Sequence, residues 1–154
     1  MAIGERIRFF RNMRGMTQKL LGIRMGFPTK GACVRIAQYE TGARVPKYNL
    51  TMNFAKVLEV SPMALNVPDV ESDLGIMHTL FAVEDLFGVR PEAGEDEVHI
   101  VLDGSRQDID RSLFRMLNTW AQQAERCSTG EITKEEYDRW RYLFPFGGVH
   151  KGEE

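Results

Sequence analysis

Residues 16–42 read MTQKLLGIRMGFPTKGACVRIAQYETG and contain two short helical patterns separated by glycine and proline. The hydroxyl of Thr17 can cap the first helix, and Gly26 permits the turn that follows it. A second helix is expected over about residues 32–41, because Gly42 comes directly after its last turn. Apolar residues recur at helical spacing in both helices: Leu20, Leu21 and Met25, then Ile36 and Tyr39. The stretch therefore predicts two helices that pack together across a turn.

Three further helices are expected around this pair. An amphipathic helix precedes it and ends at Gly15, with apolar residues at helical spacing, Ile3, Ile7 and Phe10. Pro46 suits the first turn of a fourth helix, whose inward positions are Leu50, Phe54, Ala55 and Leu58. Ser61 and Pro62 fit the cap and first residue of a fifth helix, which adds Met63 and Leu65 to the core. Residues 1–67 are thus expected to form one domain.

The charge of the chain divides between its two halves. Up to Pro68 there are 11 Lys and Arg against 3 Asp and Glu, a net charge of +8, and the remainder has 9 against 19, a net charge of −10. A compact basic segment attracts polyanions, so the first half is where a nucleic-acid surface is expected. The alternative is that charge is distributed unevenly for solubility alone.

A series of residues in fixed order and spacing runs through about residues 3–66. It includes Arg14-Gly15-Met16-Thr17-Gln18, Leu21-Gly22, Gly26-Phe27, Tyr39-Glu40-Thr41-Gly42, Pro46, Phe54-Ala55 and Leu58-Glu59-Val60-Ser61. The series resembles the Cro and phage-repressor helix-turn-helix family, often called XRE. The resemblance implies a five-helix domain whose second helix braces the DNA backbone while the third enters the major groove. Gly22 falls where this family requires a very small side chain, because the two helices cross closely there.

The resemblance places base-reading side chains on the third helix, opposite Ile36 and Tyr39. That face carries Cys33, Val34, Arg35 and Gln38. Arg can bond the O6 and N7 atoms of guanine, and Gln the N6 and N7 atoms of adenine, so Arg35 and Gln38 are the stronger candidates. For Cys33 and Val34, packing within the helix bundle is an equal alternative.

Candidates for phosphate contacts are Arg11, Gln18, Lys30, Arg44 and Lys47. Gln18 begins the second helix, whose positive dipole end attracts anions. In the family the loop that holds Arg44 and Lys47 follows the sugar-phosphate backbone, with solvated loop charges as the alternative.

Two further features bear on these contacts. The resemblance implies that Arg11 pairs with Glu40 and leaves part of its guanidinium for a phosphate. Residues 28–31 are additional to the family pattern, so the turn is longer than usual. They either extend the third helix or form a loop that brings Lys30 to a phosphate.

The acidic half predicts a linker over residues 68–73 and a helix over residues 73–87 that ends at Gly88. Val98, Ile100 and Leu102 alternate with their neighbours, which is typical of a half-buried strand. Gly94 can turn a hairpin back to Val89, or the strand can pair with another chain across a dimer axis.

Two more helices are expected after the strand. The first has one apolar face, formed by Ile109, Leu113, Met116, Leu117, Trp120, Ala124 and Cys127. The second begins with a capping box of Thr133 and Glu136 and continues to about Phe144. This last segment is similar to short C-terminal helical modules of bacterial proteins. Dimerisation is assigned to Leu113, Met116, Trp120 and Ile100.

The expected fold class is mainly α, with a five-helix repressor-like domain and then a small α+β region of about three helices and a short β-hairpin or strand. The expected domains are residues 1–67 for DNA binding, a linker over 68–73, an acidic dimerisation or partner-binding domain over 74–146, and a flexible tail over 147–154. The chain has no apolar run long enough for a membrane span and no signal-peptide pattern, so a cytoplasmic location is expected.

An enzyme is not expected from these motifs. The histidines do not form a zinc-peptidase pattern, phosphate-binding and nucleophile-elbow motifs are missing, and the two cysteines are far apart in the sequence. We therefore expect no metal and no cofactor. The first hypothesis is a dimeric repressor that reads an inverted repeat in double-stranded DNA through residues 32–41. The alternative is an antitoxin or adaptor whose acidic half binds a protein partner.

Overall fold

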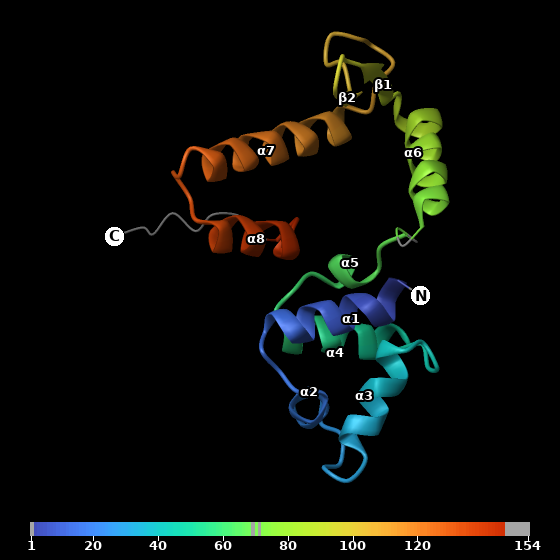
Figure 1. The fold of residues 1–154 in the computed structure, drawn as a ribbon, viewed down its shortest axis with the longest axis vertical. Coiled ribbons are helices and arrows are strands. Elements are labelled where there is room, and N and C mark those ends of the chain that lie inside the picture. Colours follow the sequence, from blue (N-terminus) through green and yellow to red (C-terminus); the bar gives the residue numbers. More distant parts are fainter. Residues whose placement is uncertain (1, 69, 71, 147–154) are drawn as a thin grey trace. The chain divides into compact units, whose positions relative to one another are not determined.

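The computed structural model describes residues 2–68, 70 and 72–146 (Figure 1). Within them the chain is mainly helical with a small antiparallel sheet, which confirms the expected fold class. The helices are α1 (Ala2–Met13), α2 (Gln18–Arg24), α3 (Ala32–Glu40), α4 (Tyr48–Leu58), α5 (Pro62–Leu65), α6 (Asp73–Phe87), α7 (Arg111–Ser128) and α8 (Lys134–Leu143). The strands are β1 (Arg90–Ala93) and β2 (Val98–Val101).

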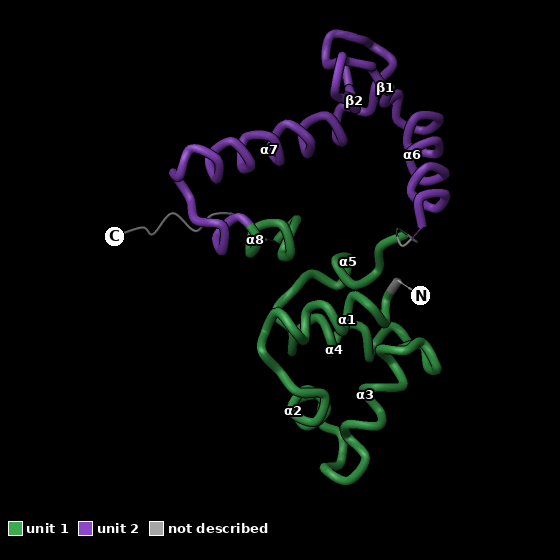
Figure 2. Tube along the Cα trace, viewed as in Figure 1, with its two compact units in different colours: residues 1–70, 138–154 green, residues 71–137 purple. Residues whose placement is uncertain are grey.

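The chain divides into two compact units (Figure 2). The first unit combines Met1–Val70 with the segment that begins at Asp138, and the second unit is Glu71–Tyr137. Helix α8 therefore contributes to both units. From the sequence we expected residues 74–146 to form one domain, whereas residues 138–146 group with the first unit in the structure.

The first unit has a continuous apolar core. It is formed by buried side chains from α1 to α5 and the turns between them: Ile7, Phe10, Met16, Leu21, Met25, Ile36, Phe54, Ala55, Leu58, Val60 and Leu65. Tyr142 of α8 packs edge-on against Phe10, with 4.9 Å between the ring centroids. The backbone N–H of Ser61 donates to the Tyr142 carbonyl oxygen at 2.8 Å. The returning segment therefore completes this unit.

Local capping signals in the first unit are confirmed at two helices. Thr17 accepts a hydrogen bond from the Leu20 amide at 3.1 Å. Ser61, which directly precedes Pro62, accepts one from the Met63 amide. The expectation for Pro46 is wrong, because α4 begins at Tyr48 after the cap residue Lys47. Pro46 is buried, so its ring packs inside the first unit just before α4 and is not part of the first helical turn.

The second unit contains a β-hairpin whose strands pair within the same chain. Arg90 lies opposite Val101 and Ala93 opposite Val98, and the Gly94 amide donates to the Glu97 carbonyl oxygen at the turn. The expectation of a half-buried strand is wrong for β2, because Val98 and Ile100 are exposed in the protomer.

Helices α6 and α7 of the second unit contain no buried residue. Val89 and Ile109 are the large apolar side chains that are buried among the described residues of this unit. Ile109 precedes Asp110, the cap of α7, so it does not lie on the helix face to which we assigned it. The capping box of α8 is confirmed, with Glu136 accepting from the Thr133 amide and Thr133 from the Glu136 amide. In the described part of the chain, no helix is both long and apolar enough to cross a membrane.

Candidate nucleic-acid interface

The close crossing of α2 and α3 depends on Gly22. A Cβ atom built at Gly22 would lie 2.8 Å from the Ala32 Cβ atom and 2.9 Å from the Ala32 carbonyl oxygen. Such a contact is too short for any side chain, so Gly22 allows the two helices to approach. The small side chain expected there is confirmed by this geometry.

Helix α3 is held by one face and is open on the other. Ala32, Ile36 and Glu40 are buried and point into the first unit. Cys33, Val34 and Arg35 are exposed, whereas Gln38 is half-buried. The sole carboxylate of α3, that of Glu40, is in the buried set. The outer face is therefore free of negative charge and accessible to a large partner.

Arg35 rests on an aromatic side chain instead of extending freely into water. Its guanidinium carbon lies 5.0 Å from the centroid of the Phe27 ring. Phe27 stacks on Tyr39 at 6.4 Å, and Tyr39 meets the buried Phe54 edge-on at 5.6 Å. A guanidinium over an aromatic face is attracted to the ring quadrupole. These contacts link Arg35 to the core and limit where its side chain can reach.

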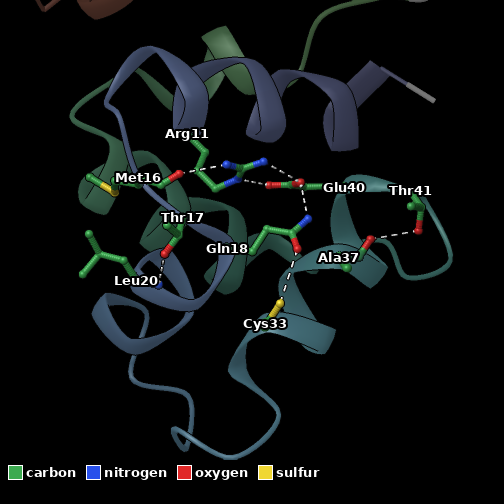
Figure 3. A network of polar contacts seen from close by, with 9 residues as sticks. All are labelled: Arg11, Met16, Thr17, Gln18, Leu20, Cys33, Ala37, Glu40 and Thr41. Carbon is green, nitrogen blue, oxygen red and sulfur yellow. Dashed lines mark hydrogen bonds and ion pairs between the residues drawn. The ribbon is translucent and has the colours of Figure 1, made fainter.

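A polar network joins α1, α2 and α3 (Figure 3). The Nε and Nη2 atoms of Arg11 donate to the two carboxylate oxygens of Glu40, and its Nη1 atom donates to the Met16 carbonyl oxygen at 2.8 Å. Only 11% of the Arg11 side chain and 3% of the Glu40 side chain are exposed. The pairing of Arg11 with Glu40 was predicted from the sequence. In the structure the pair fixes the end of α3 to α1. The phosphate contact of Arg11 stays a prediction.

Gln18 belongs to the same network. Its Nε2 atom donates to Glu40 at 2.8 Å, and its Oε1 atom accepts from the Cys33 thiol at 3.4 Å. Figure 3 shows the Gln18 amide lying between these two side chains. The side chain is thus turned into the unit, which leaves the backbone amide at the start of α2 as the group for the predicted phosphate contact.

The loop after α3 brings two basic residues together. The Arg44 amide donates to the Gln38 carbonyl oxygen at 2.9 Å, which anchors the loop to α3. Arg44 and Lys47 then line a surface hollow with Tyr39, Val45, Asn49 and Leu50. Asn49, which also lines the hollow, was not among the predicted site residues, although its place on the first turn of α4 directly after a basic loop favours a polar contact.

The extended turn of residues 28–31 places Lys30 on the surface just before α3. Gly31 is the N-cap of α3 and has a φ of 93°, a left-handed conformation that favours glycine. Helix α3 begins at Ala32, so the additional residues form a loop and do not lengthen the helix.

The residues assigned to dimerisation lie in the second unit and are not part of this surface. Ile100, Met116 and Trp120 are exposed, and Leu113 is half-buried. The indole N–H of Trp120 donates to the Tyr137 hydroxyl at 2.7 Å.

One solved structure to which the chain is similar is that of the transcriptional regulator BswR. The two are 26% identical, the match covers 54% of this chain and 93% of that chain, and the TM-score is 0.42. No family model and no curated protein matches the chain. Membership of the helix-turn-helix family therefore stays a prediction from the residues.

Proposed function

We propose that this protein is a sequence-specific, double-stranded DNA-binding transcriptional regulator of the Cro and phage-repressor type. The observation that carries the proposal is the orientation of α3. Its single carboxylate is buried against Arg11, while Arg35 faces outward. A positive, carboxylate-free helix face is suited to the major groove, whose edges lie between two rows of phosphates.

In this proposal Arg35 and Gln38 read bases, and Cys33 and Val34 contact the groove beside them. Lys30, Arg44 and Lys47 contact phosphates, together with the Gln18 backbone amide and the edge of the Arg11 guanidinium. Base contacts select the sequence, whereas phosphate contacts position the protein on any duplex. The proposal involves no catalytic step, and it includes the cytoplasmic location expected from the sequence.

The proposed regulator acts as a dimer on an inverted repeat. Two recognition helices in a symmetric dimer reach half-sites about 34 to 36 Å apart, one turn of the duplex. Repression then follows from blocking a promoter that overlaps the repeat.

Selection of bound sequences from a random duplex library, at one fixed salt concentration, tests this function. The expected result for the unmodified protein is an enriched half-site that appears as an inverted repeat. The same selection with Arg35→Ala is expected to lose this enriched sequence. Lys19→Ala, on an exposed position of α2, is the matched control and retains the motif. A library without any enriched sequence for the unmodified protein would overturn the proposal.

A second candidate function is an antitoxin or adaptor that binds another protein. The absence of buried residues in α6 and α7 favours it, because such helices need a covering surface. This function predicts binding to a partner protein with no sequence preference in the DNA selection.

A further inference from the structure

The guanidinium of Arg35 contacts protein on its face and is open at its edge. Its central carbon lies 5.0 Å from the centroid of the Phe27 ring, and the residue is exposed. With the described residues its side chain forms neither a hydrogen bond nor an ion pair. The N–H donors of a guanidinium lie in the plane of the group, so a ring stacked on its face leaves them available. Arg35 therefore presents unused donors on the outer side of α3.

Arg6 of α1 shows the contrasting arrangement. Its guanidinium carbon lies 4.6 Å from the centroid of the Phe10 ring, and its Nε atom donates to the Ala64 carbonyl oxygen at 3.0 Å. Both the face and the edge of Arg6 are thus used to hold the first unit together. The edge of Arg35 has no such use among the described residues, which indicates a partner outside the protomer.

The ring on which this guanidinium rests is itself fixed from two directions. The Phe27 amide donates to the Gly22 carbonyl oxygen at 2.9 Å, which ties its backbone to α2. The ring stacks on Tyr39 of α3 at 6.4 Å, and Tyr39 meets the fully buried Phe54 edge-on at 5.6 Å. Neither contact involves residues 28–31 of the longer turn. Phe27 is therefore a firmly held support between the core and the outer side of α3.

We infer that Phe27 is a positioning residue for base reading: it holds the Arg35 guanidinium so that its donors meet the O6 and N7 atoms of one guanine in the half-site. An arginine side chain loses rotamer freedom when a partner fixes it. Because Phe27 already restricts Arg35 in the free protein, less of this entropy is lost on DNA. The gain requires two acceptors on the base, so the stack increases discrimination and leaves general affinity for duplexes unchanged.

This inference rests on the proposed function, in which Arg35 reads a base. A phosphate also offers two acceptor oxygens to an arginine, so guanine and phosphate must be separated by experiment. The two differ in their dependence on sequence, because every duplex carries the same phosphates.

The stack is tested first on the full chain without DNA. An aromatic ring shifts the NMR signals of protons above its face upfield, so the side-chain protons of Arg35 are expected at upfield positions. The shift is expected to disappear in Phe27→Leu and to remain in Phe27→Tyr, which keeps the aromatic face. Ordinary positions for these protons in the unmodified protein would overturn the inference.

Titrations with the selected duplex and its single-base-pair variants measure the effect on recognition. Phe27→Leu keeps an apolar side chain for packing and removes the aromatic face. It is expected to lower discrimination at the base pair read by Arg35 about three- to tenfold, and Phe27→Tyr is expected to keep it. Phe9→Leu is the matched control, because Phe9 is an exposed ring that also lies 5.0 Å from a guanidinium, that of Arg6. This control is expected to leave discrimination unchanged.

A modified base identifies the group that Arg35 contacts. At the same base pair, 7-deazaguanine lacks the N7 acceptor and is expected to weaken binding of the unmodified protein but not of Arg35→Ala. If Arg35→Ala weakened all duplexes alike and the modified base had no effect, Arg35 would contact a phosphate and the inference would be wrong.

A double variant separates positioning from packing. With Arg35→Ala already present, Phe27→Leu is expected to cause no further loss of discrimination, because no guanidinium is left to position. A residue that served only the core would weaken every duplex alike when replaced, with or without Arg35. That result would contradict the positioning role of Phe27.

The results distinguish this inference from the proposed function. A selection without any enriched sequence would overturn both. An enriched sequence combined with normal discrimination in Phe27→Leu would overturn the inference alone and leave the DNA-binding function standing.

Discussion

Two Arg–Glu pairs in the first unit differ mainly in their exposure to water. Arg11 and Glu40 are almost fully buried, whereas Arg14 and Glu59 lie 3.8 Å apart with 76% of the Glu59 side chain exposed. Burial removes both charges from water, so loss of one partner leaves the other uncompensated. An exposed pair contributes much less, because water solvates each charge separately.

The first prediction compares the same substitution at these two sites. Glu40→Gln is expected to reduce the free energy of unfolding by about 3 to 5 kcal/mol, since it leaves the Arg11 charge buried without a counterion. Glu59→Gln is expected to change it by about 0 to 1 kcal/mol. Urea denaturation followed by circular dichroism measures both values. Equal effects at the two sites would contradict the structural role of the buried pair.

The second prediction separates base reading from phosphate contact. Arg35→Ala is expected to lower discrimination at one base pair by about 1 to 3 kcal/mol. Lys47→Ala is expected to weaken all sequences alike and to reduce the slope of log affinity against log salt by about 0.9. Titrations with a selected duplex and a scrambled one, at several salt concentrations, measure both quantities. If Arg35→Ala weakened both duplexes equally, Arg35 would be a phosphate contact.

For single residues, the sequence predicted which side chains pair better than it predicted the direction in which a side chain points. The pairing of Arg11 with Glu40 could be expected from the family pattern. The inward turn of the Gln18 side chain could not, because it depends on how closely the start of α2 approaches the end of α3. The stacking of Arg35 on Phe27 was likewise not predictable, because it depends on how the turn between α2 and α3 places the two side chains.

Among the helices and strands, α8 has the most complete local signal. The Thr133 amide and hydroxyl hydrogen-bond to the Glu136 carboxylate, and they hold the pKa of Glu136 below its ordinary value. A carboxylate with a lowered pKa stabilises the folded state above its ordinary pKa, and this contribution is lost as the pH falls through the lowered pKa.

The third prediction follows from the lowered pKa of Glu136. Glu136→Ala is expected to reduce the stability of α8 at neutral pH. It is also expected to abolish the fall in α8 stability on acidification, because the capping carboxylate that takes up a proton is no longer there. Hydrogen exchange of the α8 amides at several pH values measures this, and a carboxyl titration by NMR gives the pKa directly. Glu135→Ala, on the next residue, serves as the control without a capping role. An unaltered pH profile in Glu136→Ala would argue against the cap.

Elements were predictable where their signals are local. Thr17, Ser61 and Thr133 lie next to the helices they cap, so a single sequence reveals them. The exposure of β2 was not predictable, because alternation of apolar residues indicates that one face is suited to burial without showing what covers it. The same limit applies to α6, whose apolar residues are evident in the sequence although none of its described residues is buried.

For the whole molecule, the sequence carries a signal near the end of the first segment of the first unit but none for the return of the chain. The boundary near residue 68 coincides with a change in charge and a proline. The docking of Tyr142 on Phe10 joins residues more than a hundred positions apart, and no local pattern reports such a contact.

The fourth prediction concerns this docking. Tyr142→Ala is expected to lower the free energy of unfolding of the first unit by about 2 kcal/mol, because it removes a large, partly buried ring from the core. Tyr142→Phe keeps the ring and is expected to change little. Phe146→Ala, at a side chain that is 77% exposed, is the control in the same segment. Hydrogen exchange in α1 and α4 reports on the first unit alone, and identical exchange in all variants would contradict the role of Tyr142.

The return of residues 138–146 to the first unit sets an order of events during translation. A ribosome that adds about 5 to 20 residues per second needs roughly 3 to 14 s to proceed from Val70 to Asp138. Throughout that interval the nascent α1 lacks the aromatic cover of Phe10 that Tyr142 later supplies. A premature stop codon anywhere in the second unit would therefore release a polypeptide with every residue of α1 to α5 but with a weakened core.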